Sequence, residues 1–311
     1  RGIHLFMNDS SHITPDWIAV DWGTSNLRVW AMGSDGSVLA EASSEDGMGK
    51  LTREGYEPAL LRLIGPWLAE RPPVVACGMV GSRQGWCEAD YRTVPCTPLD
   101  IGGLTRAPTT DPRLSVQIAP GLKQSTPADV MRGEETQIAG ALRLMPGYDG
   151  ILCLPGTHSK WVHVSAGEVV SFQTFMTGAM FALLSEASVL RHGMQGGGWD
   201  DAAFDDAVSD ALSRPEKFGA RLFSLRAEGL IAGLSPAAAR SRLSGLLIGT
   251  ELAAAKPYWL GQRVTLIGAE KLSAAYARAL GLQNVDAQRL SATDCTLAGL
   301  TSLAQQTEDE R

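Results

Sequence analysis

The sequence predicts an α/β protein built from two similar halves. Apolar runs of strand length alternate with segments of helical apolar spacing, and one short pattern occurs twice. In each copy, at residues 21–30 and 154–163, Gly-Thr and small polar residues interrupt an apolar run that then resumes with alternating apolar side chains. This pattern predicts a β-hairpin. The two glycines, Gly23 and Gly156, are 133 positions apart in a chain of 311 residues, which fits two halves.

The tip of each predicted hairpin is a candidate phosphate-binding site. Glycine lets the backbone turn sharply and approach a ligand, while successive N–H groups and hydroxyls donate hydrogen bonds to phosphate oxygens. The alternative is that these residues only supply turn chemistry, but their recurrence between apolar strands favours a shared binding role. The candidate residues are Gly23, Thr24, Ser25 and Asn26 in the first tip and Gly156, Thr157, His158, Ser159 and Lys160 in the second.

The first half continues with a predicted strand at 37–40 and a helix at 56–69, which Pro72 and Pro73 end. A buried strand at 74–77 then runs directly into a glycine-rich loop at 78–86. Open α/β folds bind ligands at such strand ends. This loop is therefore a second candidate binding segment.

Residues 93–127 are rich in Pro, Thr and Gly and predict an irregular crossover with one strand at 114–119. The later expected elements are a helix at 134–145, the second hairpin, a mainly helical stretch at 181–255, a strand at 264–267 and a helix at 271–280. Gly268 lies between the last two. Because a helix N-terminus attracts anions, this junction is a candidate site for part of a nucleotide.

We expect three segments: an N-terminal extension at 1–15, an N-terminal domain at 16–127 and a C-terminal domain at 128–311. The N-terminal domain would carry the first hairpin and the glycine-rich loop, and the C-terminal domain the second hairpin and the adenosine site. Because the chain starts with Arg1, Met7 is a candidate natural start and residues 1–6 a candidate foreign leader.

Composition excludes several classes of protein. The chain is 44% hydrophobic and 20% charged, and its net charge of −7 without a Lys/Arg cluster argues against nucleic-acid binding. No apolar stretch reaches the roughly 18–20 residues that span a bilayer, and no secretory signal is visible, so we expect a cytoplasmic protein. Five cysteines without a Cys-x-x-Cys pair predict reduced thiols rather than disulfides.

Four segments taken together, 20–28, 78–86, 131–137 and 154–161, resemble the 2-keto-3-deoxygalactonate kinases of the actin and sugar-kinase superfamily. The resemblance covers about residues 16–303. It implies a two-domain actin-like ATPase and sugar-kinase fold, with ribonuclease H-like duplicated halves and a central cleft. It also implies transfer of the γ-phosphoryl of ATP to the terminal 6-hydroxyl of 2-keto-3-deoxygalactonate, with Mg²⁺, in galactonate catabolism.

The resemblance implies roles for the first tip and for the residues that follow the crossover. Asp21 would hold Mg²⁺ through water, the alternative being an aspartate that only caps the turn. Glu134 or Glu135 would be the catalytic base, and helix phase favours Glu135. The alternative is that both acids only stabilise the start of a helix through its dipole.

At the second tip, Lys160 would add positive charge to the phosphate site, or would be a solvated strand residue. Leu154 and Pro155 stand where many superfamily members carry an acid, so a metal ligand from this hairpin is not expected. For the carboxylate of the sugar acid, Arg83 is the first choice, with Gln84 and Trp86 beside it. The weaker candidates are Arg28 and Arg132.

Two alternative functions remain at this stage. One is a kinase of the same fold for another substrate, such as 2-keto-3-deoxygluconate or an amino sugar. The other is an actin-like nucleotide-dependent switch without small-molecule phosphotransfer, against which the Arg83 loop and the two glutamates argue. The expected ligands are ATP, Mg²⁺ and a sugar acid, with no nucleic acid or membrane partner. The sequence is compatible with a homo-oligomer but does not indicate one.

Overall fold

A computed structural model describes residues 4–6 and 13–309, and its contacts divide them into two compact units. The first unit holds the described residues up to Tyr148, Ala166–Val170 and the segment from Ala292 onward, and the second holds Asp149–Ser165 and Ser171–Ser291. The boundary therefore lies at residue 148, not at the expected 127, and the C-terminal helix returns to the first unit. The predictions for residues 1–3 and 7–12, including Met7 as a natural start, lie outside the described residues.

The first unit contains a seven-stranded sheet with the strand order β1-β4-β3-β2-β5-β8-β7. β2 is antiparallel to β3 and parallel to β5, and β5 is parallel to β8. The expected first hairpin is confirmed as β2 and β3. The strands are β1 (His4–Phe6), β2 (Trp17–Trp22), β3 (Leu27–Met32), β4 (Val38–Ser44), β5 (Val74–Gly78), β7 (Thr105–Arg106) and β8 (Val116–Ile118).

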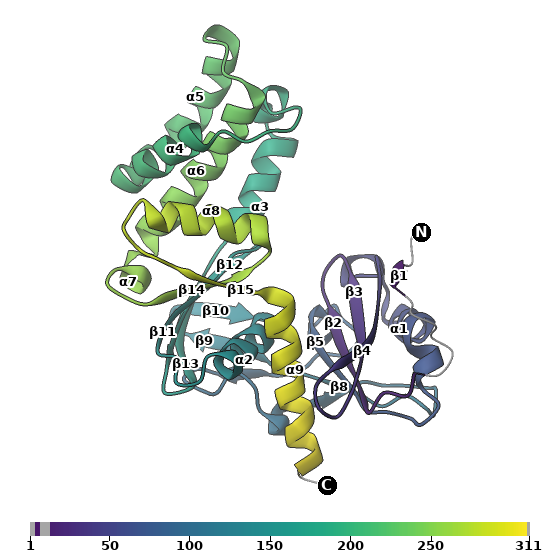
Figure 1. Cartoon of the computed structure of the whole chain (residues 1–311). Helices are drawn as coiled ribbons and strands as arrows, with labels where there is room; N and C mark the ends of the chain where they lie inside the picture. The colour runs from purple at the N-terminus through teal and green to yellow at the C-terminus, as the bar shows by residue number, and fades with distance from the viewer. Residues whose placement is uncertain (1–3, 7–12, 310–311) are drawn as a thin grey trace. The chain divides into compact units, whose positions relative to one another are not determined.

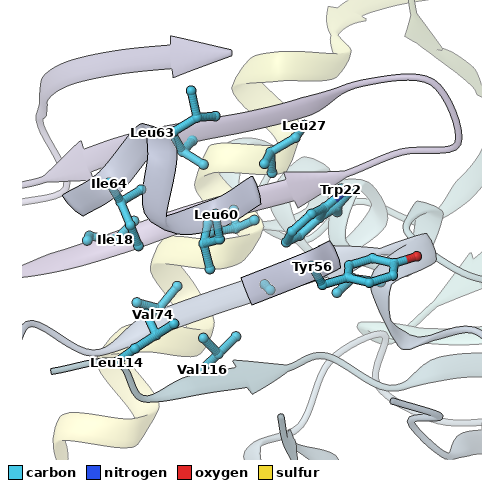
Figure 2. Close-up of a cluster of buried hydrophobic side chains, with 14 of the residues drawn as sticks. Ile18, Trp22, Leu27, Tyr56, Leu60, Leu63, Ile64, Val74, Leu114 and Val116 are labelled. Carbon is cyan, nitrogen blue, oxygen red and sulfur yellow. The ribbon is translucent and has the colours of Figure 1, made fainter. Parts of the chain in front are cut away.

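Both faces of this sheet are covered by helices. On one face, α1 (Tyr56–Ile64) packs its apolar side chains against strand residues such as Ile18 and Val74 (Figure 2). On the other face, Leu300 and Leu303 of α9 (Ala292–Asp309) pack against β2, β3 and β5. Because side chains on both faces of the sheet are buried, these strands are apolar along almost their whole length.

Two helices of the first unit, α2 (Glu134–Leu144) and α9, lie side by side (Figure 1). A Cβ atom on Gly140 would clash with the backbone carbonyl of Cys295, and one on Gly299 would clash with that of Thr136. These two glycines let α2 and α9 pack closely against each other, and both helices belong to the first unit. The sequence had predicted both segments in the C-terminal domain.

The second unit repeats the arrangement of the first sheet. Its strand order β13-β12-β11-β14-β15 corresponds to β4-β3-β2-β5-β8, with the central strand again antiparallel to its hairpin partner and parallel to the strand on its other side. The expected second hairpin is confirmed as β11 and β12. The strands are β11 (Gly150–Leu154), β12 (Ser159–Ser165), β13 (Glu168–Phe175, whose residues up to Val170 belong to the first unit), β14 (Val264–Gly268) and β15 (Gln288–Ser291). The repeated order confirms the predicted duplication.

The expected helical region of the second unit is also confirmed. The helices are α3 (Thr177–Ala182), α4 (Asp201–Ser213), α5 (Phe218–Ile231), α6 (Pro236–Ala254), α7 (Lys256–Trp259) and α8 (Glu270–Gly281). Gly245 and Gly249 let α6 approach α4, because a Cβ on Gly249 would lie 2.6 Å from the carbonyl oxygen of Val208. Among the described residues, no helix is both long and apolar enough to cross a bilayer.

Two features differ from expectation. A three-stranded sheet, β10 (Ala128–Met131), β9 (Gly121–Ser125) and β6 (Tyr91–Thr93), occupies part of the segment expected to be irregular. Its strands are too short to show periodicity, and β6 pairs with β9 across nearly 30 residues. In the expected N-terminal extension, β1 pairs antiparallel with β4, with Leu5 opposite Ala42.

Candidate functional site

The first tip is a tight turn supported from behind by a glycine-containing segment. The N–H of Gly23 donates to the carbonyl of Asn26 at 2.9 Å, and the side chains of Thr24, Ser25 and Asn26 are exposed. The N–H groups of Met48 and Gly49 donate to the carbonyls of Gly23 and Thr24 at 3.0 and 2.9 Å. The carbonyls of the tip are thus occupied, and its exposed hydroxyls and amide remain available to a ligand.

Asp21 lies in β2 just before this tip and forms an ion pair with Arg28 of β3, its neighbour in the strand register. Nη1 of Arg28 also donates to the hydroxyl of Thr293 at 3.0 Å, at the start of α9. The side chain of Asp21 keeps 19% of its exposure. The carboxylate of Asp21 is therefore oriented by Arg28 and remains partly accessible.

Glu135 is completely buried in the first turn of α2, whereas Glu134 is partly exposed. The N–H of Gly133 donates to both carboxylate oxygens of Glu135, at 2.9 and 2.7 Å. Burial, reinforced by the neighbouring charge of Glu134, raises the pKa of Glu135 to about 8. The N–H of Arg132 donates to Glu134 at 3.0 Å. One glutamate is thus held inside the unit and the other at its surface.

The first unit brings Asp21 and Glu135 to the same end of the sheet. A Cβ on Gly78, the last residue of β5, would lie 3.5 Å from Oδ1 of Asp21, and a Cβ on Gly133 would lie 3.3 Å from the Cα of Gly78. Both glycines have positive φ values, +92° and +103°. Only glycine adopts this conformation without strain, so these two residues allow α2 to start directly beside the strand end.

The thiol of Cys77 lies close enough to both carboxyl groups to sense their charge, with Sγ 4.0 Å from Oδ1 of Asp21. Cys77 pairs with Asp21 in the parallel register of β2 and β5, and it is fully buried. Burial raises the pKa of its thiol well above the usual value, and the charges of Asp21 and Glu135 raise it further. The thiol is therefore protonated and unreactive, in agreement with the expected reduced cysteines.

The predicted substrate-binding residues of the glycine-rich loop after β5 differ in how exposed they are. The side chain of Arg83 is 79% exposed, with Nε 3.6 Å from Oε1 of Glu88, and Gln84 is also exposed. Trp86, in contrast, is only 5% exposed, and its ring centroid lies 6.1 Å from that of Tyr56. Trp86 thus anchors the loop in the core, and Arg83 and Gln84 remain available to a ligand.

Arg132 supports the same loop from behind. Its guanidinium lies 4.2 Å from the ring centroid of Tyr91, and Nη2 donates to the carbonyl of Ala89 at 2.7 Å. Its Nε and Nη1 are buried and have no hydrogen-bond partner among the described residues. These contacts give Arg132 a structural role that sequence reasoning did not anticipate.

The edge of Trp86 contributes to an open cavity of about 960 Å³ in the first unit. The cavity is lined by one arginine, Arg53, and by several acids from the start of α1 and from the loops at 86–88 and 108–112. These acids are Glu54, Glu57, Glu88 and Asp111. The lining is therefore acidic overall, which disfavours the carboxylate of a sugar acid.

The second tip resembles the first in having exposed residues, Thr157 and His158, and a glycine packed behind it. The N–H of Ala179 donates to the carbonyl of Thr157 at 2.9 Å, and a Cβ on Gly178 would lie 2.8 Å from the Cα of Thr157. Gly156 is half-buried. As in the first unit, backbone hydrogen bonds hold the tip from behind.

Two predicted residues of the second tip point inward. The hydroxyl of Ser159 is buried and lies 2.9 Å from that of Tyr276, so this side chain supports the tip from inside. Lys160 is only 5% exposed, and its Nζ donates to the carbonyl of His158 at 3.3 Å. The alternative interpretation of Lys160 as a solvated strand residue is therefore wrong.

Gly268 lies beside the second tip. A Cβ on Gly268 would lie 3.3 Å from the carbonyl oxygen of Pro155 and 3.0 Å from Oγ of Ser273. The backbone that precedes α8 thus lies close to the residue that precedes the second tip.

The acids of the first unit fit a hydrated magnesium ion better than a fully protein-bound metal. No group of three His, Cys, Asp or Glu side chains that could hold a metal is found within residues 4–6 and 13–309. Mg²⁺ commonly uses one or two carboxylates together with waters and phosphate oxygens. The partly exposed carboxylate of Asp21 is of this kind.

Sequence reasoning missed a buried carboxylate, Glu251, which accepts hydrogen bonds from Trp161 and Tyr276 in the second unit. A signal was present, because this acid falls within the strongly apolar run of α6. It also missed Gly47 and Gly178, which lie behind the two tips. No local pattern predicts that Gly47, in a loop, or Gly178, in the first turn of α3, packs behind a tip.

Comparisons with known proteins agree with this arrangement. A model of the 2-keto-3-deoxy-galactonokinase family matches residues 21–303. A curated relative from Rhizobium meliloti (strain 1021), a probable 2-dehydro-3-deoxygalactonokinase, is 39% identical over 297 residues, which cover 93% of this chain and 96% of the relative. The 2-dehydro-3-deoxygalactonokinase of Escherichia coli (strain K12) is 34% identical over 295 residues, with 94% and 98% coverage.

A solved structure is also similar over nearly the full length. The crystal structure of a protein from Sinorhizobium meliloti, described as a putative 2-dehydro-3-deoxygalactonokinase, superposes with a TM-score of 0.87 at 38% identity. The match covers 94% of this chain and 99% of that protein. The two similar sheets confirm the duplicated, two-domain α/β fold that the sequence predicted. The chain belongs to the 2-keto-3-deoxy-galactonokinase family.

Proposed function

We propose that this protein is a kinase that transfers the γ-phosphoryl of ATP to the terminal 6-hydroxyl of 2-keto-3-deoxygalactonate, releasing ADP. The observation that carries the proposal is the match, over more than nine-tenths of both chains, to two relatives that are both named for this kinase. Such a kinase would serve galactonate catabolism in the cytoplasm, where ATP is available.

The two tips are proposed to bind the phosphates of ATP. Thr24, Ser25 and Asn26 would donate from the first tip, and the backbone around Gly156 and Thr157 from the second. Lys160 would supply positive charge from beneath the second tip. Fixed donors of this kind stabilise the charge that develops during phosphoryl transfer. The junction at Gly268 is proposed to contact the adenosine.

In the proposed reaction, the 6-hydroxyl oxygen attacks the γ-phosphorus and the bond to the bridging oxygen of ADP breaks. The hydroxyl proton passes to a glutamate at the start of α2, and we propose Glu135, with Glu134 as the alternative. Glu135 must first lose the proton that its raised pKa retains at neutral pH. When bound, Mg²⁺ would neutralise phosphate charge, and Asp21 would hold it through water.

The carboxylate of the sugar acid is proposed to pair with Arg83, assisted by Gln84. The exposed guanidinium of Arg83 can offer two parallel N–H donors, which suit a carboxylate. Trp86 and Arg132 would hold this loop rather than contact the substrate. Arg28 would orient Asp21.

The test is ADP release from Mg²⁺-ATP with 2-keto-3-deoxygalactonate, 2-keto-3-deoxygluconate, glucose, glycerol or no acceptor. We expect strong turnover with 2-keto-3-deoxygalactonate alone. Preference for another acceptor would reassign the substrate within the same fold. ADP release that is independent of the acceptor would indicate a nucleotide-dependent switch instead.

A further inference from the structure

A buried carboxylate in the second unit, Glu251 on α6, has no part in the proposed reaction. It is 2% exposed. Its Oε1 accepts a hydrogen bond from the indole of Trp161 at 2.8 Å, and its Oε2 accepts from the hydroxyl of Tyr276 at 2.7 Å and from that of Thr177. The side chain thus joins α6 to β12, α8 and α3. Burying a charge or a carboxyl group is costly, so an acid with this many partners specifies a particular arrangement.

Each partner of Glu251 either contacts a residue of the second tip or is adjacent in sequence to residues that form or contact it. The hydroxyl of Tyr276 lies 2.9 Å from that of Ser159, the tip residue at which β12 begins, and Trp161 is two residues further along. Thr177 begins α3, and the next two residues lie directly behind the tip. Ala179 donates to the carbonyl of Thr157 at 2.9 Å.

The contact between α3 and the tip leaves no free space. A Cβ on Gly178 would clash with the carbonyl of Gly156 and would lie 2.8 Å from the Cα of Thr157. A shift of Thr177 would therefore move the backbone of the tip. Because packed groups transmit displacement, the hydroxyl of Thr177 couples Glu251 to the position of Gly156 and Thr157.

We propose that Glu251 is a positioning residue that holds the second tip in its nucleotide-binding conformation, acting through Thr177 on one side and Tyr276 on the other. This inference rests on the phosphate-binding role proposed for the tip. The buried network around Glu251 should therefore affect ATP affinity and not recognition of the sugar acid, because the residues that the network contacts lie at 156–161 or pack against them.

The experiment compares Thr177→Val, which removes the hydroxyl, with Thr177→Ser, which keeps it. Thr250→Val is the matched control, since the hydroxyl of Thr250 donates to the carbonyl of Leu246 in its own helix. The dissociation constant of Mg²⁺-ATP is measured by calorimetry without acceptor, and the KM values of both substrates by ADP release. We expect Thr177→Val to weaken ATP binding by about tenfold to 10²-fold, as misplacement of binding groups does.

Thr177→Ser should restore ATP affinity, Thr250→Val should leave it unchanged, and the KM of the sugar acid should change less than twofold in all three. If Thr177→Val does not fold, Tyr276→Phe supplies the same comparison. Unchanged ATP affinity in a folded variant, or equal losses for both substrates, would overturn the inference. Because calorimetry needs no acceptor, it tests the inference even if the wild-type protein phosphorylates no sugar acid, which would contradict only the proposed function.

Discussion

Arg28 forms an ion pair with Asp21 across the first hairpin and donates a second hydrogen bond to Thr293 at 3.0 Å. The guanidinium thus connects the proposed magnesium-binding carboxylate to the start of α9. Both partners occupy it, which leaves it poorly placed to bind the carboxylate of a substrate.

Replacing Asp21 or Arg28 should therefore distinguish a role in Mg²⁺ binding from a role in binding the sugar acid. Asp21→Asn is expected to lower kcat by about 10²-fold or more and to raise the Mg²⁺ concentration for half-maximal rate, since the metal loses its charged ligand. Arg28→Gln should lower kcat less and leave the KM of the sugar acid unchanged. The measurement is ADP release over a Mg²⁺ titration. A large rise in the sugar-acid KM of Arg28→Gln would return Arg28 to substrate binding.

Glu135→Gln should abolish most turnover while ATP still binds. Loss of a general base typically costs about 10²- to 10⁴-fold in rate. Glu134→Gln, one residue away and partly exposed, is the control and is expected to keep most of the activity. Steady-state kinetics and calorimetric ATP binding test both variants. The opposite result, a silent Glu135→Gln and an inactive Glu134→Gln, would move the base to Glu134.

If Glu135 is the base, the rate should increase with pH. Its pKa of about 8 means that the proton-accepting form increases as pH rises from neutrality to 9. We expect kcat of the wild-type protein to rise over this interval with saturating substrates. A kcat that stays constant from pH 6.5 to 9 would contradict the assignment.

The same carboxyl group should make stability depend on pH. Below its ordinary value of 4.5, Glu135 is protonated in both the folded and the unfolded chain. Between 4.5 and about 8, only the unfolded chain releases the proton, so the free energy of unfolding falls as pH rises. Glu135→Gln should therefore be more stable than wild type at pH 8, by about 1–3 kcal/mol. Chemical denaturation at pH 5 and pH 8 measures this; an equal difference at both values would argue against a buried, protonated Glu135.

Arg83→Ala should raise the KM of the sugar acid by about tenfold or more and leave the KM of ATP within twofold, because a charge-assisted pair with the substrate is lost. Arg113→Ala is the control, an exposed arginine of the same unit that pairs with Asp111. Both KM values come from the ADP-release assay. Equal increases for the two substrates would remove Arg83 from the sugar-acid site.

Gly47→Ala tests the support of the first tip. A Cβ at this position would clash with the backbone of Thr24 and Ser25. We expect weaker ATP binding and a loss of about 1–3 kcal/mol in stability, as overpacking causes. Gly65→Ala is the control, since a Cβ there meets nothing within 4 Å. ATP affinity as in wild type for Gly47→Ala would show that the tip tolerates displacement.

Local sequence patterns determined much of this fold. Gly-Thr turns between apolar runs identified both hairpins, and helical spacing identified α1, α2 and α8, because these signals arise within a few residues of chain. The small sheet of β6, β9 and β10 gave no such signal, since its pairing joins short strands far apart in sequence. The family resemblance likewise followed from four segments in a fixed order.

Only the tertiary structure decided how exposed the candidate residues are and which groups they contact. It buried Glu135 and left Glu134 partly exposed, although the two are adjacent and chemically identical. It also paired Arg28 with Asp21 and connected Glu251 to the second tip. Burial and partnership depend on which distant segments pack around a side chain, as α9 does beside Arg28 and α3 beside Glu251. The sequence by itself determined which chemical groups this protein carries, and packing determined which of them are exposed and which are buried against other side chains.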